Sequence, residues 1–164
     1  MSAVHLHLII THFPITGLFF AAALLLIGFF AENKAYAKAG LYLVIFCALC
    51  TAIAYFSGEN AEDIADKFDS AADFYLEQHE DAAKLALIAG IVSGVFAVAT
   101  LIFIRKADNN RKMLLPVLAV VLVSLALFVR TGNLGGQIRH TEIRENSSIA
   151  TPVLEQKQSE KDDD

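Results

Sequence analysis

Four apolar segments divide the chain, and each has a length suited to crossing a lipid bilayer. They run over residues 5–30, 39–57, 83–104 and 113–129. A transmembrane helix needs about 20 residues, so the fourth helix either stands nearly upright or continues past Arg130. No segment alternates between apolar and polar residues as a strand does. Because hydrocarbon offers no water to pair with the backbone, the pattern predicts an all-α, four-helix integral membrane bundle.

The polar stretch 58–81 separates the second and third segments. It contains nine acidic residues and one lysine. No helix-breaking residue interrupts 71–83, so the third helix is predicted to begin near Ser70 and to extend beyond the membrane. Most of these acids are interpreted as a solvated helix face. Four of them flank the helix ends nearest the histidines: Glu59, Glu62, Glu77 and Glu80.

Composition supports a membrane protein with one domain. Hydrophobic residues make up 55% of the 164 residues and charged residues 19%, which is too apolar for an ordinary soluble domain. A net charge of −5 argues against a nucleic-acid partner. The transmembrane domain is predicted over 1–144, and the polar remainder, 145–164, is predicted to be disordered.

The short loops predict the orientation of the chain. Lys34 and Lys38 lie in the loop 33–40, and the loop 105–112 carries four basic residues and one aspartate. The positive-inside rule places both loops in the cytoplasm. Both termini and the acidic stretch then lie outside an inner membrane that the chain crosses several times.

Histidines gather on the predicted outer side. His5 and His12 are seven residues apart, nearly two helical turns, and therefore share a face of the first helix. Pro14 removes a backbone donor and is expected to kink this helix, turning His12 into the bundle. His79 and His140 are predicted to approach from the third helix and from the segment after the fourth. His7 is instead interpreted as an interfacial residue.

Ionisable residues in apolar spans suggest a functional site, and imidazoles from facing helices suit haem iron or a transition metal. In a haem b site, glycines would admit the macrocycle and arginines would neutralise its propionates. The candidate residues are His5, His12, His79, His140, Gly135, Gly136, Arg139 and Arg130. A transition-metal site would use His12, His79 and His140. Its oxygen ligand would be Glu80, or else Glu77, Glu59 or Glu62.

The segment after the fourth span, 130–143, contains Gly132, Gly135 and Gly136. Glycines permit a sharp turn or a close approach of the backbone. Ile138 and Ile143 give the segment apolar surface, so it is predicted to fold back over the outer mouth of the bundle.

The remaining polar residues are assigned structural roles. Cys47 and Cys50 form a C-x-x-C spacing inside a span and are interpreted as small packing residues. Small residues also recur at every fourth position in two spans, which predicts close helix contacts. These residues are Ala48 and Ala52 in the second span and Ala86, Gly90 and Gly94 in the third.

Two alternatives to a redox or electron-transfer function stay open. In the first, the histidines and acids form a structural polar cap on a scaffold or partner-binding protein. The third hypothesis is proton or small-ion transport, which a histidine can support. No nucleophile elbow, phosphate loop or catalytic triad is present, which favours a protein that is not an enzyme.

Several motifs resemble a prokaryotic four-helix membrane domain, the domain of unknown function family 2231. The motifs are His5-x6-His12-Phe13-Pro14-Ile15, Ser57-Gly58-Glu59, Glu77-Gln78-His79-Glu80, and Gly132-x-Leu134-Gly135-Gly136-x3-His140. Leu6 follows His5 where the family usually has proline. The resemblance covers residues 5–143 and implies the four-span fold. Some relatives are joined to redox modules, which by analogy favours a haem and a redox partner on the outer face.

Overall fold

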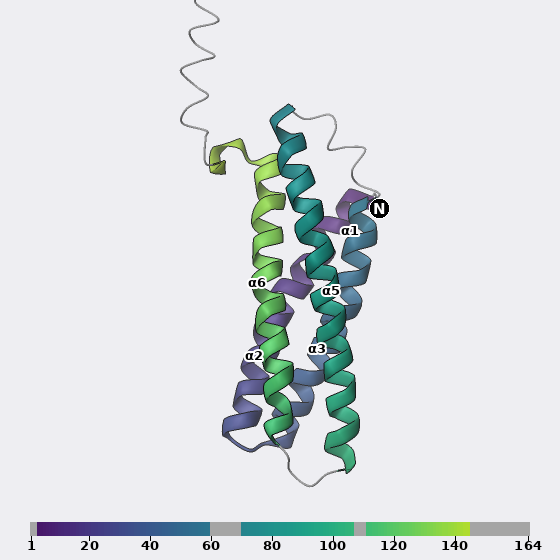
Figure 1. The fold of residues 1–164 in the computed structure, drawn as a ribbon, viewed down its shortest axis with the longest axis vertical. Coiled ribbons are helices and arrows are strands. Elements are labelled where there is room, and N and C mark those ends of the chain that lie inside the picture. The colour runs from purple at the N-terminus through teal and green to yellow at the C-terminus, as the bar shows by residue number, and fades with distance from the viewer. Residues whose placement is uncertain (1–2, 60–69, 107–110, 145–164) are drawn as a thin grey trace, which may run out of the picture.

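The structure is a computed structural model that describes residues 3–59, 70–106 and 111–144, and within them the fold is a bundle of long helices (Figure 1). No strand occurs in these ranges. The α-helices are α1 (Ala3–Ile10), α2 (His12–Phe30), α3 (Lys34–Glu59), α5 (Ser70–Lys106) and α6 (Leu114–Arg139). Two short 3₁₀ turns, η1 (Arg111–Met113) and η2 (Thr141–Ile143), flank α6. The predicted all-α bundle is confirmed. The predicted disorder of 145–164 and the position of Glu62 lie outside the described residues.

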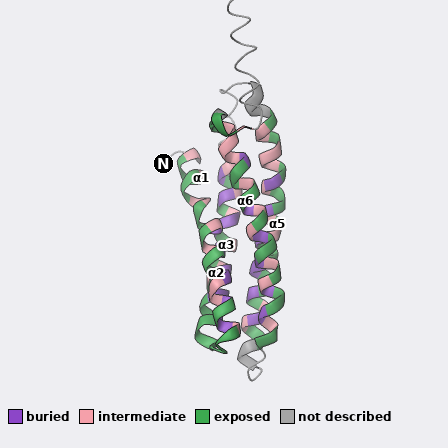
Figure 2. Ribbon diagram, turned by 90° about the vertical axis from the view of Figure 1, so that its left-hand side faces the viewer, coloured by how far each residue is buried: buried purple, intermediate pink, exposed green. Residues whose placement is uncertain are grey.

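Four stretches within the described residues are long and apolar enough to cross a membrane: Val4–Phe30, Lys34–Gly58, Phe74–Phe103 and Arg111–Arg139. Many large apolar residues are exposed on the outside of the bundle. Figure 2 shows that exposed positions run along the length of the helices. Phe19, for example, is 62% exposed, whereas its neighbour Leu18 is 1% exposed. Such an apolar exterior is stable against lipid tails, so the fold is that of a multi-pass membrane protein.

The first span consists of α1 and α2, separated at Thr11. Pro14 lacks the N–H that would otherwise bond to the Ile10 carbonyl, which weakens the helix at this point. The Thr11 amide still donates to the His7 carbonyl at 3.1 Å. The helix is therefore interrupted next to His12, where the kink was predicted.

The third and fourth spans both extend past their apolar segments. The third helix, α5, begins at Ser70 as predicted, and its 37 residues correspond to about 55 Å. The fourth helix, α6, continues past Arg130 to Arg139. The prediction that the glycines of 130–143 turn the chain back is wrong, because Gly132, Gly135 and Gly136 are all helical.

The chain reverses only after α6 has ended. Arg144 donates to the carbonyls of Gln137 and Ile138 at 2.8 and 3.0 Å. Its guanidinium also lies 5.1 Å from the centre of the Tyr75 ring on α5. This arginine therefore pairs two of the carbonyls that the end of a helix leaves open, and it ties α6 to α5.

The bundle has two chemically different ends. The histidine end, at the top of Figure 1, contains α1, the start of α5 and the end of α6. The lysine end contains the connection from α2 to α3 and the start of η1. Here Arg111 forms an ion pair with Glu32 at 2.5 Å and lies over the Phe29 ring. This contact joins two connections that are far apart in the sequence.

Small residues let the helices approach one another closely. A Cβ added at Gly28 would lie 2.6 Å from the backbone nitrogen of Ala37, so α2 and α3 are in backbone contact. Gly90 and Gly94 of α5 face Thr51 and Ala48 of α3, which confirms the predicted small-residue packing. The bundle interior also contains a hydrogen bond of 2.9 Å between Ser93 on α5 and Ser124 on α6. Cys47 and Cys50 are buried, as expected of packing residues.

Substituting Gly28→Ala should destabilise the protein by about 1–3 kcal/mol, because the new methyl group meets backbone that cannot move cheaply. Thermal unfolding in mild detergent, followed by circular dichroism, measures this effect. Gly132→Ala is the matched control, since its Cβ would meet only the tip of the Ile15 side chain, at 3.3 Å. Equal stability of the two variants would contradict the close α2–α3 contact.

Candidate functional site

The histidine end brings two imidazoles together, His7 from α1 and His79 from α5. Their ring centroids lie 6.3 Å apart, and the ring planes are nearly perpendicular, at 84°. Both side chains are partly buried. We call these two residues the His7–His79 pair.

Backbone carbonyls hold both rings. Nδ1 of His7 donates to the carbonyl oxygen of Ala54 on α3 at 2.9 Å, and Nδ1 of His79 donates to that of Thr131 on α6 at 2.9 Å. A carbonyl oxygen can only accept, so in each neutral ring Nδ1 carries the proton and Nε2 keeps its lone pair. Ring orientation by a backbone carbonyl is also a usual feature of histidines that bind metals through the other nitrogen.

Two glycines make room for the pair. A Cβ added at Gly58 on α3 would lie 2.9 Å from Cε1 of His7, and one added at Gly135 on α6 would lie 3.0 Å from Cε1 of His79. Each imidazole therefore packs directly on a neighbouring helix backbone. Gly135, predicted to admit a cofactor, instead contacts one of the histidines.

The pair lies toward the same end of two candidate spans. His7 is near the start of Val4–Phe30, and His79 is near the start of Phe74–Phe103. From Phe30 to His7 the first span rises about 35 Å, and from Phe103 to His79 α5 rises about 36 Å. The two rings therefore meet close to one end of the bundle and not at its middle.

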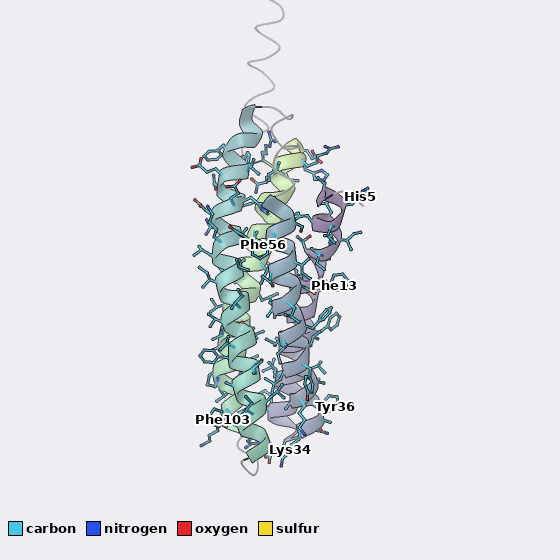
Figure 3. All side chains as sticks on the ribbon, turned by 90° about the vertical axis from the view of Figure 1, so that its right-hand side faces the viewer. His5, Phe13, Lys34, Tyr36, Phe56 and Phe103 are labelled. Atoms are coloured by element: carbon cyan, nitrogen blue, oxygen red, sulfur yellow. The ribbon has the colours of Figure 1, made fainter. Side chains whose placement is uncertain are left out.

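The predicted inward position of His12 is wrong. Its side chain is exposed, and its Nδ1 donates to the Leu8 carbonyl one turn earlier on its own chain, at 2.7 Å. Pro14 is buried, and position 12 lies about 200° away from it around the helix, which turns His12 outward. His5 also lies on the outer side of α1 (Figure 3). The shared face of His5 and His12 is therefore the one that points away from the bundle.

His140 also lies apart from the pair. It is exposed just beyond α6, where its Nδ1 contacts Glu142 Oε1 at 2.8 Å. A hydrogen bond from its own backbone amide, and then the bond to His140, hold the pKa of Glu142 below its usual value. His140 is thus engaged with its own turn.

The other predicted site residues are distributed around this end. Gly136 faces Ile143, Arg130 and Arg139 are exposed on α6, and Glu80 is partly buried next to His79 on α5. Among the described residues, no three His, Cys, Asp or Glu side chains are grouped as ligands of one metal ion. The predicted convergence of His5, His12, His79 and His140 is therefore not observed, and the pair contains His79 alone of these four.

Sequence reasoning missed His7, although the sequence contained a signal for it. His7 precedes Pro14 by seven residues, so the two share a face. The stripe continues through Leu18, Ala21 and Leu25, all of which are buried. Bulky phenylalanines lie on the other sides of α2. The absence of phenylalanine from the stripe distinguishes the inner face from the outer ones.

Substituting Gly135→Ala should lower the melting temperature, because the methyl group would displace the His79 ring from the Thr131 carbonyl. The matched control is Gly136→Ala, whose Cβ meets Ile143 at an ordinary 3.4 Å. That variant should be neutral or gain up to about 1 kcal/mol of helix propensity. Thermal unfolding of both variants measures the difference, and a shift of the same sign and size in both would contradict the assigned packing.

Comparison with known proteins gives one match. A model of the family described as "Predicted membrane protein (DUF2231)" matches residues 3–142, most of the chain, including both histidines of the pair. No curated protein and no solved structure matches this chain.

Proposed function

This chain belongs to the DUF2231 family of predicted membrane proteins, and we propose that it binds haem b through the His7–His79 pair and transfers electrons at one membrane face. The observation that carries the proposal is the pairing of two imidazoles from different helices, each fixed through Nδ1. His7 and His79 would hold the haem iron through Nε2, the ring nitrogen that keeps its lone pair. When bound, the haem would supply one-electron chemistry between ferric and ferrous iron.

The spacing of the rings supports this assignment. The ring centroids of His7 and His79 are 6.3 Å apart, although the two residues come from different spans. Both imidazoles could therefore hold one bound group together.

The number of available ligands favours haem over a bare ion. Haem iron receives four nitrogens from its macrocycle and needs only two from the protein. A structural zinc site usually takes four protein ligands, and the described residues offer no group of even three. The smaller version of the same proposal is a transition-metal ion without a macrocycle, bound by the two imidazoles and by water. Arg144, Arg139 and Arg130 are the cations near this end that would meet the propionates.

The position of the pair indicates the side at which a redox partner would dock. Because both histidines lie at one end, electrons would be exchanged with a redox protein at that face and would not cross the bundle. The basic loops favour an inner-membrane orientation with the lysine end in the cytoplasm. Both termini and the His7–His79 pair would then be outside, where the redox partner would dock.

Single substitutions of the pair test the proposal. His7→Ala and His79→Ala should each abolish the Soret band of protein purified in mild detergent or reconstituted with haemin. His12→Ala and His140→Ala are matched controls, since these imidazoles are exposed at the same end, and they should keep the band. A parent protein that has no Soret band with or without haemin would contradict haem binding, and metal analysis of the same sample would test the smaller version.

A second function, a structural cap, has a specific observation in its favour. The two carbonyl bonds link α1 to α3 and α5 to α6, so the pair joins all the spans at this end. If this is its whole role, His7→Ala and His79→Ala should lower the melting temperature of a colourless, metal-free parent. If the pair binds a cofactor, the two variants should instead lack the cofactor at temperatures where the bundle is still folded.

The orientation can be tested separately. Alkaline phosphatase fused after Arg144 should be active, because that enzyme folds only outside the cytoplasm, whereas a fusion in the 105–112 loop should be inactive. Fluorescent-protein fusions at the same sites should give the reverse pattern. Activity at the loop and none after Arg144 would invert the proposed topology.

A further inference from the structure

A groove runs along the lysine end between α3 and α5. It encloses about 270 Å³ and is lined by Lys38, Tyr42 and Ile45 from α3 and by Val98, Leu101 and Ile102 from α5. Tyr42, Val98 and Ile102 are exposed, so the groove opens on the side of the bundle that faces the membrane. Its position is separate from the His7–His79 pair, which lies at the other end.

The groove is polar at one end and apolar at the other. Lys38 is one turn from the start of α3 at Lys34, and Ile45 lies about 10 Å further along the helix. A lysine at this depth extends its ammonium toward the headgroups while its stem covers apolar surface. Tyr42, one turn further along α3, also lines the groove, and tyrosines are common at membrane interfaces.

From this arrangement we infer that the groove binds one anionic phospholipid, with its phosphate at Lys38 and one acyl chain along Ile45, Val98 and Leu101. The charge of this end is complementary to such a lipid. Lys38 lines the groove, Lys34 lies one turn before it, and the nearby acid Glu32 is already paired with Arg111. Basic pockets between transmembrane helices are known to favour anionic headgroups. The volume is smaller than that of a drug-sized pocket, about 300–1,000 Å³, and suits part of one acyl chain.

Native mass spectrometry of protein released from nanodiscs tests the site. The discs contain equal amounts of phosphatidylglycerol and phosphatidylcholine with matched acyl chains. The parent should retain one phosphatidylglycerol in preference to phosphatidylcholine. Lys38→Gln should lower this preference about fivefold, the effect expected for one lysine near a charged surface. Val98→Trp should fill the groove and lower retention of both lipids.

Lys112→Gln is the control, since it removes a positive charge from the same end without touching the groove. It should keep the parental preference. The proposal is overturned if Lys38→Gln retains phosphatidylglycerol like the parent, or if Lys112→Gln loses as much preference as Lys38→Gln. The proposal is also overturned if the parent retains both lipids equally. Circular dichroism of each variant confirms that the helices are intact.

Discussion

The close approach of α2 to α3 is the contact on which the rest of the structure depends. With Gly28 against the backbone of Ala37, and Gly40 against Leu25, only one side of α2 can face the bundle. This fixes the rotation of the whole first span, because α1 continues α2 with only a brief interruption. His7 falls on the inner side, and His12 falls on the lipid side. Helix packing at the lysine end thus determines which histidine faces the interior at the opposite end of the bundle.

The parts of the fold that follow from solvation could be predicted from the sequence. Four apolar stretches in a medium without water have to be helical, and the uninterrupted 71–83 stretch places the start of α5 at Ser70. The rotation of each helix could not be predicted in the same way. A span that is apolar on every side carries little periodicity to distinguish its lipid face from its packed face. Gly135 was misread for a related reason, because close approach of a side chain and a backbone turn both require glycine.

Polar side chains inside the bundle are hydrogen-bonded to one another or to nearby carbonyls. The imidazoles that could bind a ligand are found only near one end of the described residues. Ser93 bonds to Ser124, and Thr51 donates to the Cys47 carbonyl one turn away. Among the described residues, no buried side-chain nitrogen or oxygen lacks a hydrogen-bond partner. These side chains need no ligand to complete their hydrogen bonds. The partly buried His7–His79 pair lies instead near one end of the bundle.

The length of α5 gives the molecule a built-in asymmetry. Its 37 residues make a rod of about 55 Å, whereas a bilayer with its headgroups is about 40–45 Å thick. At the histidine end α5 rises above the other helices (Figure 1). Nine residues of α5 precede His79, so about 13 Å of this helix stands beyond the pair. A molecule that approached the two histidines along the axis of the bundle would meet the first turns of α5 first.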